Sequence, residues 1–132
     1  MKSLAVALLL LAPVALAMDR FAALSMVESG DNDAARGPDG EVSRFQIRVE
    51  VWSQLTNAPV SQATDPKVAE PVARRLAAAR CEKFEREHDR PPTDVEFYVL
   101  WNAPAQIDQP HGKVLKRAQR FANLVGQKEP AK

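Results

Sequence analysis

"SMVESGDNDAARGPDGEVSRFQI", residues 25–47, leads from an apolar helical pattern directly into a glutamate and then into a loop rich in Gly, Asp and Asn. Glu28 lies at this junction, where Gly30 predicts the end of the helix. The turn residues Gly37–Gly40 then predict an irregular loop or a short hairpin. Glu28 is therefore either a functional acid or a solvated helix end, and the rest of the chain has to distinguish the two.

The first residues have the pattern of a secretory signal peptide. Lys2 gives a positive start, residues 4–11 form a compact apolar run that Pro13 breaks, and Ala15–Ala17 supplies the small-x-small pattern of a cleavage site. The apolar run is well short of the ~20 residues that span a bilayer, so a retained anchor is the weaker alternative. We expect an exported protein, periplasmic or extracellular, with no stable membrane insertion after cleavage.

This pattern divides the chain into three parts. We predict a signal peptide over residues 1–17, one domain over residues 18–126 and a flexible polar tail over residues 127–132. The domain is long enough for one hydrophobic core but not for two.

Composition limits the function classes. The formal net charge is +1 over 132 residues, whereas nucleic-acid binding usually requires a basic face. Cys81 is the single cysteine and cannot form an internal disulfide. His88 and His111 lack companions at metal-ligand spacing. We therefore expect no nucleic-acid partner, no metal and no cofactor, and we expect a monomer.

Helix signals dominate the first half of the domain, and strand signals are scarce. Asp19 is placed to cap a helix with Phe21, Leu24 and Val27 on its inner face. A second short helix is expected over Ile47–Leu55.

Further signals mark three helices in the second half. Asp65-Pro66 begins one helix, and Pro71 predicts a kink or a restart within it. Thr93 and Glu96 form a capping box that opens the apolar run 97–101, the expected buried central helix. An amphipathic helix over 113–125 closes the domain. The predicted fold class is mainly α.

The residues after Glu28 resemble the catalytic motif of soluble lytic transglycosylases, in the lysozyme-like superfamily. That family reads Glu-Ser-Gly-Phe-Asn-Pro-x-Ala-x-Ser-x-x-Gly-Ala-x-Gly-Leu-Met-Gln-Ile. The positions that match it without a gap are Glu28, Ser29, Gly30, Asn32, Ala35, Gly40, Gln46 and Ile47. Downstream, Trp101-Asn102-Ala103-Pro104 stands where the family has Tyr-Asn-Ala-Gly. The resemblance covers the layout of most of the domain but only these two segments in detail.

The resemblance implies a small lysozyme-like domain that cleaves peptidoglycan glycan strands. Glu28 would be the catalytic general acid and base at the bond between N-acetylmuramic acid and N-acetylglucosamine, giving a 1,6-anhydro product with help from the substrate's N-acetyl group. It also implies that Gln46 binds sugar, that Asn102 positions the substrate or the acid, and that Ser29 helps to hold the loop. The substrate-binding set predicted on this basis is Ser29, Gln46, Tyr98, Trp101 and Asn102.

The chemistry explains a glutamate at a helix end in a cleft wall. Partial burial favours the neutral carboxyl, which can donate its proton to a glycosidic oxygen. We therefore expect the helix that ends at Glu28 to pack against the Thr93 helix, with the Gly37–Gly40 loop as one lip of a cleft.

Several positions depart from the family pattern. The family serine that is thought to orient the N-acetyl group is Gly37 here, and the family tyrosine beside Asn102 is Trp101. Ser43 replaces a glycine at a place where a close backbone approach is usual, and Pro104 replaces another glycine. Such changes suit either a divergent enzyme or a degenerate one.

Other interpretations stay open from the sequence. The domain could bind cell-wall glycan without cleaving it, or serve as an envelope scaffold for protein contacts. Asn102 could simply cap its helix, and Trp52 could belong to the core. A second carboxylate or calcium ligands could be sought in the loop, but solvated loop charge is the better account of these acids: Asp31, Asp33, Asp39 and Glu41.

Overall fold

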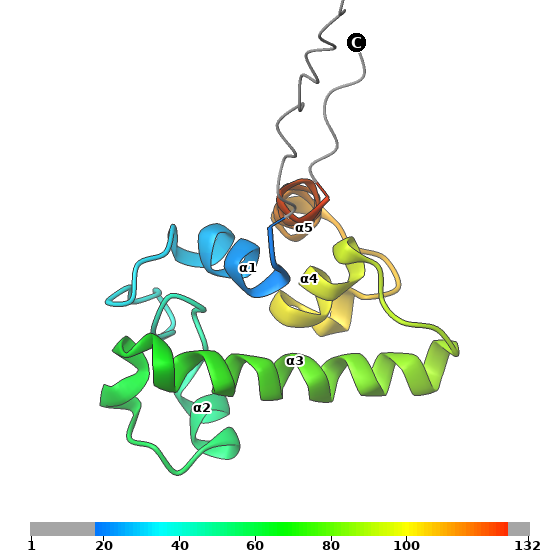
Figure 1. Ribbon diagram of the computed structural model, residues 1–132. Coiled ribbons are helices and arrows are strands. Elements are labelled where there is room, and N and C mark those ends of the chain that lie inside the picture. The colour runs from blue at the N-terminus through cyan, green and yellow to red at the C-terminus, as the bar shows by residue number, and fades with distance from the viewer. Residues whose placement is uncertain (1–17, 127–132) are drawn as a thin grey trace, which may run out of the picture.

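The computed structural model describes residues 18–126 and is mainly helical, as predicted (Figure 1). The predicted signal peptide and the predicted tail lie outside these residues. In chain order the elements are α1 (Arg20–Ser29), α2 (Val49–Leu55), the 3₁₀ turn η1 (Val60–Thr64), α3 (Pro66–His88), α4 (Asp94–Asn102), the 3₁₀ turn η2 (Pro104–Gln106) and α5 (Gly112–Val125).

The helices pack around the long helix α3. α2 lies on one side of α3, whereas α1 and α4 lie on the other side, and α5 covers α1 and α4 (Figure 1). Two small bridges, Arg36 with Val42 and Val42 with Ile47, are the β-pairing within residues 18–126. They make the segment between α1 and α2 an irregular loop with a trace of hairpin, which confirms the prediction for this region.

α1 has the termini that its sequence predicts. The Asp19 carboxylate accepts from the backbone N–H of Phe21 at 2.7 Å and of Ala22 at 3.4 Å. Gly30, at φ 63°, ends the helix in the left-handed conformation, and its N–H donates to the carbonyl of Met26. Glu28 is therefore fixed in the last turn of a well-capped helix.

α3 is not broken at Pro71, so the prediction of a restart at this residue is wrong. The helix is continuous from Pro66 to His88, with Asp65 as its N-cap. Pro71 has no N–H to offer the carbonyl of Lys67, but both residues are exposed and water can satisfy that carbonyl. The inner face of α3 is lined by Ala69, Val72, Ala73, Leu76, Ala77 and Phe84.

α4 is the buried centre of the domain, as predicted from its apolar run. Residues 97–101 are all buried, and both hydrogen bonds of the Thr93–Glu96 capping box are present. Arg90 donates two hydrogen bonds to the Glu96 carboxylate, and with the Thr93 contacts this lowers the pKa of Glu96 to about 2. The cap therefore keeps its charge at any physiological pH.

Aromatic contacts join α4 to its neighbours. The Phe97 and Phe121 rings stack with centroids 5.5 Å apart, and the Phe21 and Phe97 rings meet edge to face with centroids 6.1 Å apart.

Trp52 belongs to the core, at 1 % exposure, and its Nε1–H donates to the carbonyl of Ala58. None of the described helices is long and apolar enough to cross a membrane.

We expect Thr93→Ala to lower the free energy of unfolding by about 1 kcal/mol, because it leaves the N–H of Glu96 without its cap. Thr64→Ala is the matched control, since the Thr64 hydroxyl makes only a 3.4 Å bond in an exposed turn, and it should cost less than about 0.5 kcal/mol. Urea unfolding measures both values. Equal effects of the two substitutions would contradict a stabilising role for the capping box.

Candidate active site

Glu28 faces a cavity of about 510 Å³ that opens between the helix ends and the loop. The last turn of α1 supplies Glu28, the loop supplies most of one wall, and α2, α3, the end of α4 and α5 complete it. The lining residues are Glu28, Arg36, Gly37, Pro38, Asp39, Glu41, Gln46, Ile47, Arg48, Val51, Leu76, Arg80, Trp101, Asn102 and Arg117. The two sequence segments that carry the resemblance thus meet at one cavity, and the Gly37–Gly40 turn forms part of its edge.

The predicted site residues divide into two groups. Glu28, Gln46, Trp101 and Asn102 line the cavity, whereas Ser29 and Tyr98 do not. Trp101 is only 7 % exposed, so little of its ring is free for stacking on a sugar. Asn102 is exposed at the last position of α4 and can present its amide to a ligand.

Tyr98 contacts Glu28 rather than the cavity. The Tyr98 hydroxyl, on the buried side chain at the middle of α4, donates to Glu28 Oε1 at 2.5 Å. Burial and the neighbouring Glu28 charge raise the pKa of Tyr98, so the phenol keeps its proton and remains the donor. Tyr98 therefore orients the carboxyl of Glu28, and its predicted contact with substrate stays a prediction.

Burial is the largest influence on Glu28 and raises its pKa above the usual value of 4.5. The hydrogen bond from Tyr98 and the charge of Arg117 act in the opposite direction, while the charge of Glu41 adds to the rise. Glu28 also lies at the carboxyl-terminal end of α1, where the helix dipole places a partial negative charge. This partial charge disfavours the ionised form of the Glu28 carboxyl. The neutral, proton-bearing form is thus favoured more than for an exposed glutamate.

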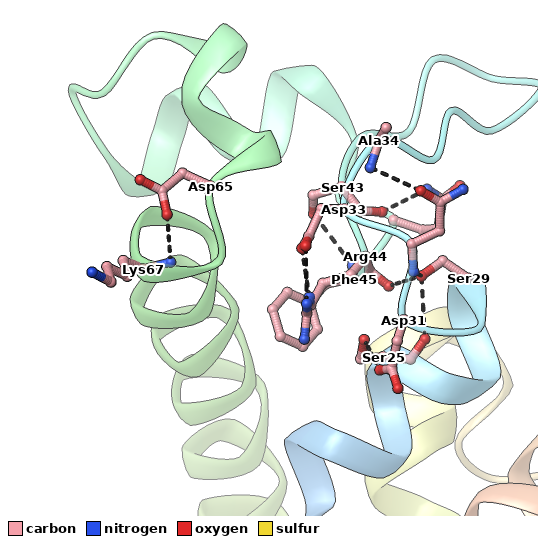
Figure 2. A network of polar contacts seen from close by, with 12 residues as sticks. Ser25, Ser29, Asp31, Asp33, Ala34, Ser43, Arg44, Phe45, Asp65 and Lys67 are labelled. Carbon is pink, nitrogen blue, oxygen red and sulfur yellow. Dashed lines mark hydrogen bonds and ion pairs between the residues drawn. The ribbon is translucent and has the colours of Figure 1, made fainter.

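Ser29 holds the loop that forms the cavity wall (Figure 2). Its hydroxyl donates to the carbonyl of Arg44 at 2.8 Å and accepts from the N–H of Asn32 at 3.1 Å. Arg44 in turn makes two hydrogen bonds to the Asp33 carboxylate, at 2.6 and 3.0 Å. These bonds fasten both ends of the loop to α1, which agrees with the loop-holding role expected of Ser29.

Gln46 is fixed by the same loop. Its Nε2 donates to the carbonyls of Ser43 at 2.8 Å and Ala35 at 3.2 Å, which leaves Oε1 beside Gly37. Ser43 and Gln46 both have positive φ, 72° and 52°. Such backbone strain in a non-glycine residue persists only where the surroundings enforce it, and it concentrates at functional loops.

Four arginines in the cavity lining were not singled out by the sequence. Arg36, Arg48 and Arg117 take part in none of the ion pairs found within residues 18–126. They come from the loop, the start of α2 and the cavity side of α5, so no spacing along the chain connects them. Among the described residues, no group of three His, Cys, Asp or Glu side chains could hold a metal ion.

Arg80 has a different place, under the end of α4. Its Nη1 donates to the carbonyl of Leu100 at 3.0 Å and also to that of Trp101. These carbonyls have no partner within their own helix, and a cation at a helix carboxyl end is favourable. Arg80 therefore fixes the position at which Trp101 and Asn102 enter the cavity.

Comparison with protein families, with curated proteins and with solved structures finds no match for this chain. The likeness to lytic transglycosylases therefore rests on the residues themselves, and it stays a prediction.

Arg80→Met should lower the free energy of unfolding by about 1.5–3 kcal/mol, because it removes a charged donor from two carbonyls. Arg86→Met, an exposed substitution on the same helix, should change it by less than about 0.5 kcal/mol. Thermal and urea unfolding compare the two variants. A cost for Arg80→Met no larger than that for Arg86→Met would show that the guanidinium does not support α4.

Proposed function

We propose that this protein cleaves the glycosidic bond between N-acetylmuramic acid and N-acetylglucosamine in peptidoglycan glycan strands, with Glu28 as the general acid. The observation that carries the proposal is the Glu28 carboxyl at the cavity wall, oriented by Tyr98 and with its pKa raised by burial. A carboxylic acid in this state can protonate the leaving oxygen of a glycosidic bond.

The remaining cavity residues support a sugar ligand. Gln46 is held by the loop and Asn102 is exposed at the end of α4, so both offer polar groups to hydroxyl or N-acetyl groups. A cavity of about 510 Å³ is within the usual range for ligand sites.

The arginines support an acidic glycan in particular. Arg36, Arg48 and Arg117 bring three positive charges to the cavity. Muramic acid carries a lactyl carboxyl group or a stem peptide with carboxylates, whereas a plain N-acetylglucosamine polymer is neutral. Guanidinium groups bind carboxylates with paired, charge-assisted hydrogen bonds. Peptidoglycan therefore suits this cavity better than a neutral glycan, and an exported protein would meet it.

Binding without cleavage is the second candidate. The hydrogen bond from Tyr98 and the charge of Arg117 both favour the ionised carboxylate of Glu28. If these two contacts outweighed burial, the domain would hold glycan strands through its polar and cationic lining without a proton to donate.

Glu28→Gln should abolish release of soluble fragments from purified peptidoglycan, a loss of at least ~10²–10⁴-fold. The amide has nearly the same size and keeps an oxygen that accepts from Tyr98, so folding and wall binding should be nearly unchanged. The measurement is fragment release by the full chain, followed by mass spectrometry, with a peptidoglycan pull-down in parallel.

Glu82→Gln is the matched control, because Glu82 is exposed on α3 and does not line the cavity. It should cleave like the wild type. Equal cleavage by wild type and Glu28→Gln would contradict the catalytic role of Glu28. Binding by both without cleavage by either would support the second candidate instead.

A further inference from the structure

A second carboxylate lies in the same cavity as Glu28. Glu41 lines the cavity, is half-buried, and its Oε2 accepts from the backbone N–H of Asp39 at 3.0 Å. Its charge reaches Glu28, since it contributes to the raised pKa of that group. Glu41 is therefore distinct from the solvated loop charge expected from the sequence, in contrast to Asp33, which Arg44 neutralises.

The absence of a side chain at Gly37 creates the place that the Glu41 carboxylate occupies. A Cβ atom at Gly37 would lie 2.0 Å from Glu41 Oε2 and 2.8 Å from Gln46 Oε1, which is too close for either contact. Both oxygens thus converge on the space beside Gly37. They are near enough for a single water molecule to donate a hydrogen bond to each.

The two oxygens are also held in their positions. The N–H of Asp39 fixes Glu41 Oε2, and the two bonds from Gln46 Nε2 to backbone carbonyls fix Gln46 Oε1. A carboxylate and an amide oxygen in this arrangement accept hydrogen bonds and donate none. A water molecule that donates to both oxygens has its own lone pairs directed away from Glu41 and Gln46 and toward the cavity.

The environments of the two carboxyl groups differ in the way that acid–base catalysis requires. Glu28 lies beside the phenol of Tyr98, and burial raises its pKa and favours its neutral form. Glu41 is on the loop, and its Oε2 accepts a hydrogen bond from the backbone N–H of Asp39. Two carboxyls of one cavity in different surroundings can divide the roles of acid and base.

We propose that Glu41 is the general base that activates a water molecule, so that the cleavage proposed above is a hydrolysis with inversion and not the formation of an anhydro sugar. The proposal rests on the proposed function of Glu28. The bond between the anomeric carbon and the bridging oxygen breaks, and the Glu28 proton goes to that oxygen. The water oxygen bonds to the anomeric carbon, and the water proton goes to Glu41. Solvent then restores both carboxyls.

This reaction differs from the one implied by the resemblance to lytic transglycosylases. There the same glutamate would take the proton from the sugar's own 6-hydroxyl, with the N-acetyl group oriented by a serine. Here Gly37 replaces that serine, and the Glu41 carboxylate takes up its space. In an inverting enzyme the base and its water act on the face of the sugar opposite to the acid, which yields the α-anomer from a β-linked chain.

The test is product analysis with soluble, uncross-linked peptidoglycan glycan chains in oxygen-18-labelled water. The wild type should release reducing ends that carry one labelled oxygen, and proton NMR at early times should show the α-anomer first. Glu41→Gln should lower cleavage ~10²–10⁴-fold, with Glu82→Gln again unchanged. The glutamine can still accept from the N–H of Asp39, and thermal unfolding of the variant checks that the loop is intact.

Gly37→Ala gives a second, independent variant. It removes no functional group, but its Cβ would displace both the Glu41 carboxylate and Gln46 Oε1, between which the water is proposed to bind, so it too should lower cleavage. Unlabelled anhydro ends from the wild type would overturn the proposal for Glu41 and leave the role of Glu28 intact. Full activity of Glu41→Gln, or a β-anomer as first product, would also overturn it. No cleavage by the wild type would instead contradict the proposed function itself.

Discussion

The hydrogen bond from the Tyr98 hydroxyl to Glu28 is the contact on which the candidate site depends. It joins the last turn of α1 to the middle of the buried helix α4, 70 residues later in the chain. Tyr98 is itself fixed by burial and by packing against Phe121 on α5. The orientation of one carboxyl at the cavity wall is therefore determined by the packing of three helices, and the loop and Arg80 then place the other cavity residues around it.

This contact also limits how far the pKa of Glu28 rises. Burial and the charge of Glu41 raise its pKa, whereas Tyr98 and Arg117 lower it. Because the pKa of Glu28 is raised in the folded state, ionisation of this carboxyl opposes folding. The free energy of unfolding is therefore highest below the pKa of the unfolded chain and falls as pH rises through the folded-state pKa. The domain thus gives up some stability near neutral pH to hold a carboxyl in a half-buried place, which is typical of functional sites.

Local signals allowed the helices to be predicted, because Asp19, Asp65-Pro66 and the Thr93–Glu96 box act on amides within a few residues. Of the kink or restart predicted at Pro71, the restart is wrong, because the exposed carbonyl of Lys67 can be satisfied by water and the sequence does not reveal that exposure. Glu28, Gln46 and Asn102 were predicted to share a site through motif spacing. Glu41 was interpreted as solvated loop charge because its place depends on the turn that brings its carboxylate onto Gly37. Arg117 carried no signal in the sequence, because only the packing of α5 brings its charge near Glu28.

The central claim is that Glu28 carries a proton in the folded domain at a pH where an ordinary glutamate does not. The most direct measurement is a carbon-detected NMR titration of its carboxyl in the full chain, assigned by the signal that disappears in Glu28→Gln. We expect a midpoint above 4.5, the usual value for this side chain, because burial raises the pKa of Glu28. A midpoint at or below 4.5 would show that Tyr98 and Arg117 dominate, and it would contradict the role of Glu28 as general acid.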